Sequence, residues 1–182
     1  MQDYKDIIGE ILIDEKTLQK RVKELGDQIS HDYAGQDLLL ACVLRGGIVF
    51  MVDLMRHVTV PHALDCMALT SYGIGARAST GNIRMSLDLQ TNIENKNVLL
   101  VEDIVDTGFT LRYMLQTLAG RAPNSLAVCT FLDRNSRRIV QVPVDYRCFE
   151  IPDRFVVGFG LDYNQLYRNL SYVAVMKPER SA

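Results

Sequence analysis

The sequence predicts an α/β protein with a central parallel sheet flanked by helices. At 182 residues, of which 48% are hydrophobic, the chain is long enough to bury a core as one domain without disulfides or structural metal. Short apolar runs typical of buried strands alternate along it with segments whose apolar residues recur at helical spacing. Because such alternation places a helical crossover between successive strands, it favours a parallel sheet covered on both faces.

The first elements follow this alternation in order. A strand at 7–13 precedes an amphipathic helix from about Glu15 to His31, in which leucine, valine and isoleucine recur three or four residues apart. The uninterrupted apolar run Leu38–Leu44 predicts a strand buried on both faces. We expect a second helix directly after Gly47 and a third strand at 64–69.

The middle of the chain continues the pattern after one interruption. Residues 70–82 are rich in Ser, Thr and Gly and predict a long mobile loop. Apolar and polar residues then alternate over 83–89, as in a half-buried strand. Strands at 98–101 and 126–132 enclose a helix at 108–119.

Composition excludes several classes of protein. Twenty basic and 22 acidic residues give a net charge of −2, so no overall attraction to nucleic acid or to an anionic membrane is expected. The four cysteines show no C-x-x-C spacing and the three histidines are too few and too badly spaced for zinc. We therefore expect reduced thiols in a cytoplasmic protein without a membrane segment.

The most informative segment runs from Val98 to Leu111. Its apolar strand is followed at once by Glu102 and Asp103, and then by Asp106 in a turn rich in Gly and Thr. An N-capped helix would explain a single threonine in the turn. It would not explain three acids at the carboxyl end of a strand, where open α/β sheets bind ligands and unpaired charges are costly.

This segment resembles the phosphoribosyl-pyrophosphate signature of the type I phosphoribosyltransferases. The resemblance implies that the acids Glu102 and Asp103 hold the ribose hydroxyls. It also implies that a loop cradles the 5′-phosphate, with Asp106, Thr107, Gly108, Phe109 and Thr110. Response regulators also carry paired acids after a strand, but there the acids close the first strand of the domain. Here roughly a hundred residues precede the acids, which favours the phosphoribosyl site.

Three further segments match the same family and imply a pyrophosphate site. Arg45 and Gly46 close the second strand, and the resemblance places a cis peptide bond between Leu44 and Arg45. Ser71-Tyr72 opens the predicted loop, which in the family closes over the reacting centre. Arg168 matches an arginine that contacts pyrophosphate.

The segment from Ile151 to Tyr163 resembles the base-binding segment of hypoxanthine-guanine phosphoribosyltransferases. By this resemblance Phe155 stacks on the purine, the Val156 backbone reads its 2-position, and Asp162 helps to place magnesium. Arg134 stands where the family usually has a lysine that bonds the purine 6-oxo group. This is a departure, because Arg is a planar fork and Lys a point donor.

The resemblance implies one phosphoribosyltransferase domain over 1–182. Its hood, a small subdomain over the active site, would come mainly from the amino-terminal segment and about 134–182, where Pro143 and Pro152 break the regular pattern. We expect a homodimer or homotetramer with no nucleic acid or membrane partner.

The implied reaction transfers a 5-phosphoribosyl group from phosphoribosyl pyrophosphate to N9 of hypoxanthine or guanine, giving IMP or GMP and pyrophosphate in purine salvage. Asp106 would be the general base, and Glu102, Asp103 and Asp162 would hold Mg²⁺. Two alternatives remain open. One is a phosphoribosyl-pyrophosphate-sensing regulator that binds RNA, and the other is a xanthine-preferring phosphoribosyltransferase.

Overall fold

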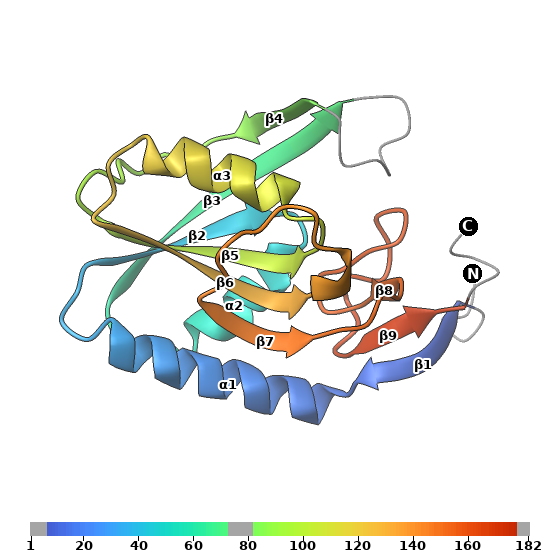
Figure 1. Cartoon of the computed structure of the whole chain (residues 1–182). Helices are drawn as coiled ribbons and strands as arrows, with labels where there is room; N and C mark the ends of the chain where they lie inside the picture. Colours follow the sequence, from blue (N-terminus) through green and yellow to red (C-terminus); the bar gives the residue numbers. More distant parts are fainter. Residues whose placement is uncertain (1–6, 73–81, 178–182) are drawn as a thin grey trace.

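The structure, a computed structural model, describes residues 7–72 and 82–177, and its main feature is a six-stranded sheet (Figure 1). The strand order is β4-β3-β2-β5-β6-β7, and all neighbours are parallel except β3 and β4, which are antiparallel. The strands are β2 (Leu38–Leu44), β3 (His62–Tyr72), β4 (Asn82–Leu87), β5 (Asn97–Val105), β6 (Ser125–Asp133) and β7 (Tyr146–Glu150).

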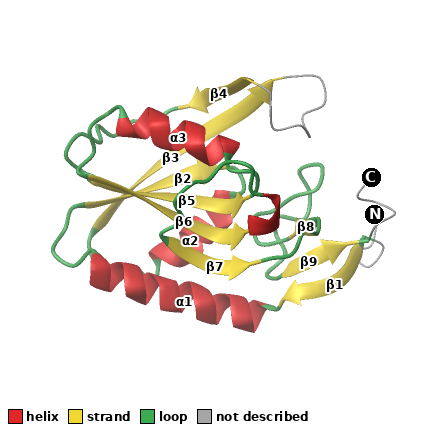
Figure 2. Cartoon of the chain, in the orientation of Figure 1, coloured by secondary structure: helices red, strands yellow, loops and turns green. Residues whose placement is uncertain are grey.

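Helices cover both faces of this sheet (Figures 1 and 2). Two of them, α1 (Glu15–Asp32) and α2 (Gly47–Met55), lie on one face, and α3 (Phe109–Ala119) lies on the other. The Asp14 carboxylate caps α1 by accepting from the backbone N–H of Thr17 at 2.9 Å. The three-layer arrangement predicted from strand–helix alternation is confirmed.

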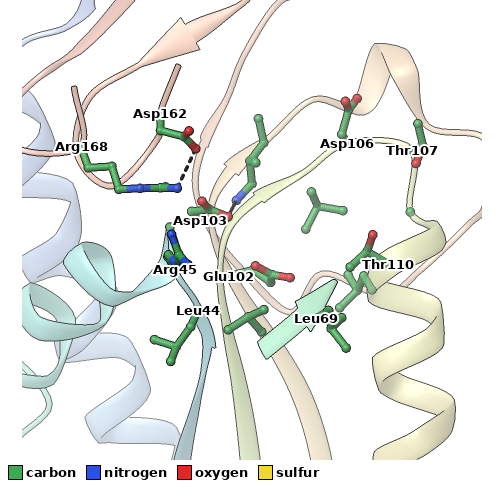
Figure 3. Close-up of a pocket in the computed structure, with 16 residues that line it drawn as sticks. Leu44, Arg45, Leu69, Glu102, Asp103, Asp106, Thr107, Thr110, Asp162 and Arg168 are labelled. Atoms are coloured by element: carbon green, nitrogen blue, oxygen red, sulfur yellow. Dashed lines mark hydrogen bonds and ion pairs between the residues drawn. The ribbon is translucent and has the colours of Figure 1, made fainter. Parts of the chain in front are cut away.

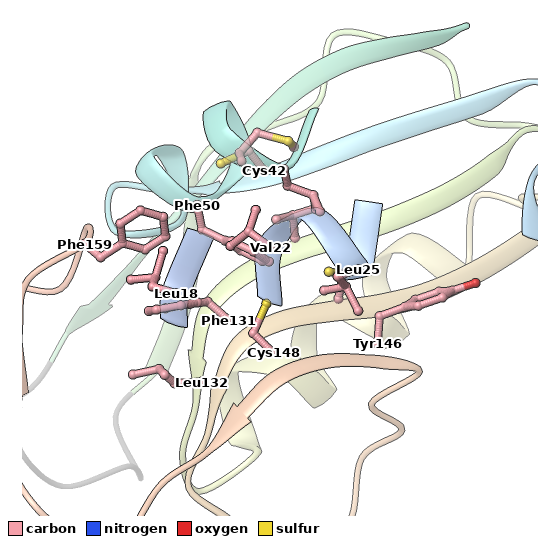
Figure 4. Close-up of a cluster of buried hydrophobic side chains, with 14 of the residues drawn as sticks. Leu18, Val22, Leu25, Cys42, Phe50, Phe131, Leu132, Tyr146, Cys148 and Phe159 are labelled. Atoms are coloured by element: carbon pink, nitrogen blue, oxygen red, sulfur yellow. The ribbon is translucent and has the colours of Figure 1, made fainter. Parts of the chain in front are cut away.

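The core follows from the two-residue period of the strands. Alternate β2 residues such as Leu40 and Cys42 pack with α1 and α2, whereas Leu39 and Ala41 pack with α3 on the opposite face. On the α1 and α2 side, Phe131 lies among other aromatic side chains (Figure 4). Burying both faces of β2 explains why its sequence is an unbroken apolar run.

A small antiparallel sheet stands beside the carboxyl ends of the main strands. Its order is β1-β9-β8, formed by β1 (Ile8–Ile13), β8 (Val156–Val157) and β9 (Val173–Met176). We call this sheet, with the turns between β8 and β9, the hood. It joins the two ends of the described chain. Strand β7 lies within 134–182, the part of the chain expected to contribute to the hood, but it pairs with β6 in the main sheet.

Several boundaries differ from those predicted. Strand β3 continues to Tyr72, beyond the predicted end at Leu69, because its backbone pairs with β4 as far as Asn82. Ser71 and Tyr72 therefore belong to a strand, and 73–81, the rest of the predicted mobile loop, lie outside the described residues. Strand β5 also continues past Val101, so two of the acids lie within it.

Each helix in residues 7–72 and 82–177 is too short or too polar to cross a membrane.

Candidate active site

A cavity of about 330 Å³ opens at the carboxyl ends of β2 and β5, beside the amino-terminal ends of α2 and α3 (Figure 3). Parallel α/β sheets place ligands at this edge because loops from several strands converge there. The cavity brings together residues that are far apart in the sequence. It is lined by Val43, Leu44, Arg45, Gly46, Leu69, Glu102, Asp103, Ile104, Val105, Asp106, Thr107, Gly108, Thr110, Leu111, Asp162 and Arg168.

Glu102 and Asp103 bring two neighbouring carboxyls to this cavity. Burial, reinforced by the adjacent Asp103 charge, raises the pKa of Glu102 well above its usual range. Burial also raises the pKa of Asp103 to about 6, although the backbone N–H of Ile104 donates to Asp103 Oδ1 at 2.8 Å and opposes the shift. Carboxyls that resist ionisation in this way are suited to a cation or to hydroxyl donors, either of which would stabilise their anionic forms.

The turn between β5 and α3 has the geometry of a phosphate site. Gly108 caps α3 with a φ of +91°, and a Cβ there would overlap the carbonyl oxygen of Val140. Both the backbone conformation and the lack of space therefore require glycine. The free N–H groups and positive dipole end of α3 meet the cavity at this turn, where they would stabilise an anion.

Two arginines lie together at another edge of the cavity. Arg45 Nη1 and Arg168 Nη2 both donate to Oε1 of Gln165, at 3.0 and 3.1 Å. Arg168 also forms an ion pair with Asp162 at 2.8 Å (Figure 3). The peptide bond between Leu44 and Arg45 is cis, as the resemblance implied. Two guanidinium groups held side by side suit a ligand with several anionic oxygens.

A second cavity of about 220 Å³ adjoins the first and is covered by the hood. It is lined by Asp103, Ile104, Asp106, Arg134, Phe155, Val156, Leu161 and Asp162. Within the described chain, only two buried side-chain N or O atoms have no hydrogen-bond partner, and they are Asp106 Oδ1 and Arg134 Nε. Buried polar atoms without partners are costly, so a ligand with polar groups is expected here.

Arg134 is held firmly in this second cavity. Its Nη2 donates to the carbonyl oxygen of Arg154 at 2.7 Å, and its Nη1 lies 3.5 Å from Asp106 Oδ2. Phe155 keeps 42% of its surface exposed and meets the Tyr163 ring edge-to-face, with ring centroids 5.9 Å apart. A partly exposed aromatic ring and a guanidinium group that line the same cavity suit a planar heterocycle with polar groups on its edge.

The structure thus brings most of the predicted site residues to these two adjoining cavities. Phe109 is an exception, because it begins α3 without lining either cavity. Ser71 and Tyr72 lie in β3, and their side chains are outside what the structure describes. Sequence reasoning missed Gln165 and the apolar contribution of Leu69.

Comparison with known proteins agrees with this geometry. The phosphoribosyl transferase domain family matches residues 10–164. A hypoxanthine phosphoribosyltransferase from Salmonella typhimurium is 48% identical over 166 residues, covering 90% of this chain and 93% of that protein. A hypoxanthine-guanine phosphoribosyltransferase from Streptococcus thermophilus is 42% identical over 172 residues, covering 94% and 95%.

Solved structures give the same result. A crystal structure of a hypoxanthine phosphoribosyltransferase from Staphylococcus aureus superposes with a TM-score of 0.93 at 41% identity, covering 98% of this chain and 96% of that one. A ternary substrates complex of a mutant hypoxanthine phosphoribosyltransferase from Trypanosoma cruzi superposes with a TM-score of 0.91 at 38% identity, covering 97% of this chain and 100% of that one. The chain therefore belongs to the type I phosphoribosyltransferase family, and within it to the hypoxanthine-guanine phosphoribosyltransferases.

Proposed function

We propose that the protein transfers a 5-phosphoribosyl group from phosphoribosyl pyrophosphate to N9 of hypoxanthine or guanine, giving IMP or GMP and pyrophosphate. The protein is an enzyme whose activity is that of a hypoxanthine-guanine phosphoribosyltransferase in purine salvage. One observation carries the assignment of the site: the two cavities share Asp103, Asp106 and Asp162. A sugar phosphate in the first cavity and a base in the second would meet at these acids.

The residues of the first cavity have distinct parts in this proposal. Glu102 and Asp103 accept hydrogen bonds from the ribose hydroxyls, while the 106–110 turn binds the 5′-phosphate through backbone N–H groups and threonine hydroxyls. Arg45 and Arg168 stabilise negative charge that develops on pyrophosphate as the bond to the anomeric carbon breaks. Binding at both ends of the substrate orients this carbon toward the second cavity.

The residues of the second cavity bind and activate the purine. Phe155 stacks on the ring, and Arg134 donates to the 6-oxo group. Asp106 accepts the purine proton as general base, a role that suits a carboxylate whose Oδ1 has no hydrogen-bond partner. Attack by N9 on the anomeric carbon then releases pyrophosphate.

The acids also fit Mg²⁺. Within 7–72 and 82–177 no three His, Cys, Asp or Glu side chains are grouped closely enough to hold a metal ion. Mg²⁺ does not need such a cage, because it commonly binds one or two carboxylates together with water and substrate phosphates. Glu102, Asp103 and Asp162 supply carboxylate oxygens beside the proposed pyrophosphate site. When bound there, Mg²⁺ would neutralise charge on the leaving pyrophosphate.

The remaining properties follow the same proposal. The 1–182 chain is taken as one phosphoribosyltransferase domain that assembles as a homodimer or homotetramer. The four free cysteines are compatible with a reducing cytoplasm. Sedimentation measured over a range of protein concentrations would test the assembly.

A steady-state assay of pyrophosphate release with hypoxanthine, guanine, xanthine, adenine and uracil tests the activity. Hypoxanthine and guanine should be converted with Mg²⁺ present, and adenine and uracil should not. Efficient use of xanthine alone would support the xanthine-preferring alternative. Salt-dependent RNA binding without any turnover would instead support the RNA-binding regulator.

A further inference from the structure

Segment 134–140, between β6 and β7, holds the back of the proposed phosphate loop. We call this segment the brace. It donates hydrogen bonds to three consecutive carbonyl oxygens where β5 passes into the loop. Arg134 N donates to Val105 O at 2.9 Å, Arg138 Nε to Asp106 O at 3.0 Å, and Ile139 N and Val140 N to Thr107 O at 3.0 Å each. These hydrogen bonds hold the carbonyl groups of the loop so that they point toward the brace.

Fixing these carbonyls also fixes the direction of the N–H groups. Within the described chain the only cis peptide bond is Leu44–Arg45, so the loop peptides are trans. In a planar trans peptide the N–H points opposite to the carbonyl of the preceding residue. The N–H groups of Asp106, Thr107 and Gly108 therefore point away from the brace, and all three residues line the first cavity. Several N–H groups directed into one concavity make an anion site.

Arg138 holds the middle of the loop through its side chain, which reaches Asp106 O. This side chain is 5% exposed, and its Nη2 forms an ion pair with Asp133 Oδ1 and a longer contact of 3.5 Å with Val105 O. The Asp133 side chain is also almost fully buried, and its other oxygen accepts from Arg147 Nη1 at 2.9 Å. Arg147 is partly exposed and forms its ion pairs with Asp133 and Glu150 instead of the loop, which makes it a natural control.

We propose that Arg138, held in place by Asp133, is a positioning residue that directs the loop N–H groups toward the 5′-phosphate. A buried ion pair alone gives little net stability, since desolvation offsets much of the attraction. The fork of Arg138 does more than pair with Asp133, because it also reaches two consecutive carbonyls of the loop. This inference rests on the proposed function and adds to it a residue outside both cavities.

The test compares a ligand that has the 5′-phosphate with one that lacks it. Dissociation constants of GMP and guanosine are measured by calorimetry with Mg²⁺ for the unmodified protein, Arg138→Gln and Arg147→Gln. Arg138→Gln should raise the dissociation constant of GMP by at least about tenfold, because hydrogen bonds from charged donors are lost. Guanosine binding should change less than about twofold. Arg147→Gln should leave both constants unchanged.

Kinetics give a second readout that a loss of folded protein would not reproduce. In Arg138→Gln the KM for phosphoribosyl pyrophosphate should rise, whereas inhibition by inorganic pyrophosphate, which has no 5′-phosphate, should not change. If Arg138→Gln does not fold, Arg138→Lys keeps a charge beside Asp133. A single ammonium cannot replace the planar fork, so the same selective loss is expected.

The outcomes separate this inference from the proposed function. If GMP and guanosine weaken equally in both Arg138 variants, Arg138 is structural and the inference is wrong while the function stands. If the unmodified protein binds GMP no more tightly than guanosine, the phosphate site fails and the inference fails with it.

Discussion

Gly46 lies directly against the carboxylate of Asp103: a Cβ built on Gly46 would overlap Asp103 Oδ2. The backbone of Gly46 has an ordinary helical conformation, with φ −61° and ψ −42°, so space and not backbone strain requires glycine here. The loop after β2 and the acids of β5 are therefore packed against each other. This contact places the proposed pyrophosphate site beside the proposed ribose site.

Gly46→Ala should impair catalysis because Asp103 or the loop must move to make room for the methyl group. We expect kcat/KM for phosphoribosyl pyrophosphate to fall by about tenfold or more, since displacements of about 1 Å in a site are costly. Gly120→Ala is the control, because a Cβ at Gly120 would have no neighbour nearer than 3.6 Å. Equal activity of the two variants would contradict the packing described here.

Asp106→Asn and Asp103→Ala should have different kinetic effects. Asp106 lines both cavities, and loss of a general base typically lowers turnover by about 10²–10⁴-fold. Binding of phosphoribosyl pyrophosphate by Asp106→Asn should stay nearly intact. Asp103→Ala should instead weaken substrate binding through the ribose and Mg²⁺. If both variants lose only affinity and keep full turnover, Asp106 is not the base.

The buried acids should also make the stability of the ligand-free protein depend on pH. Burial raises the pKa of Asp103 from 3.8 to about 6. Between these values the unfolded chain releases this proton and the folded protein keeps it, so the free energy of unfolding falls as pH rises. Asp103→Asn should remove the part of this dependence that Asp103 contributes, while the part from the buried Glu102 stays. The variant should raise the free energy of unfolding at pH 7 by up to about 3 kcal/mol, while activity falls.

Urea unfolding at pH 4 to 7, in buffer with a chelator and no substrate, measures this effect. Asp88→Asn is a control of opposite sign, because the side-chain hydrogen bonds from Arg121 lower the pKa of Asp88. That variant should be less stable than the unmodified protein at pH 7. A stability curve that is the same for Asp103→Asn and the unmodified protein would show that Asp103 is readily ionised in the free enzyme.

The sequence predicted those elements whose boundaries depend on burial. Strand β2 has the predicted ends, Leu38–Leu44, because an apolar run marks a strand covered on both faces. Strand β5 was predicted to end at Val101 because acids follow. Pairing with β6 nevertheless continues to Val105, opposite Asp133, because backbone hydrogen bonds hold the two acids within the strand whatever their polarity. Local hydrophobicity cannot report such pairing.

In the site, too, residues marked by the local sequence were predicted and residues placed by long-range contacts were not. Glu102 and Asp103 were predicted because acids directly after an apolar strand are unusual. Gln165 was not, because its contacts depend on a turn in which Asn164 and Gln165 have φ values of 51° and 67°. This turn brings the Gln165 amide to Arg45, 120 residues earlier in the chain. Nothing in the local sequence encodes such a contact.

Arg134 gives the most specific prediction, because by the resemblance it stands where the family usually has a lysine. Its Nη2 is bound to Arg154 O, and its buried Nε has no hydrogen-bond partner, so the guanidinium is fixed at the wall of the second cavity with a donor still unused. Hypoxanthine and guanine offer an acceptor oxygen at the 6-position, whereas adenine offers an amino group. An unpaired buried polar group costs roughly 1–3 kcal/mol, so adenine should be disfavoured by at least about tenfold to a hundredfold.

Arg134→Ala should therefore raise the KM for hypoxanthine and guanine more than the KM for phosphoribosyl pyrophosphate. Arg154→Ala is the matched control, because Arg134 bonds the backbone of Arg154 and the exposed Arg154 side chain pairs with Glu10. Arg154→Ala should change the KM values for the purines and for phosphoribosyl pyrophosphate by less than about twofold, as expected for an exposed ion pair. Unchanged kinetics in Arg134→Ala would shift the role to Arg137, which lies 3.6 Å from Asp106. Efficient use of adenine by the unmodified protein would instead show that Arg134 does not select the base. The guanidinium and the 6-amino group of adenine are both donors, so neither can pair with the other.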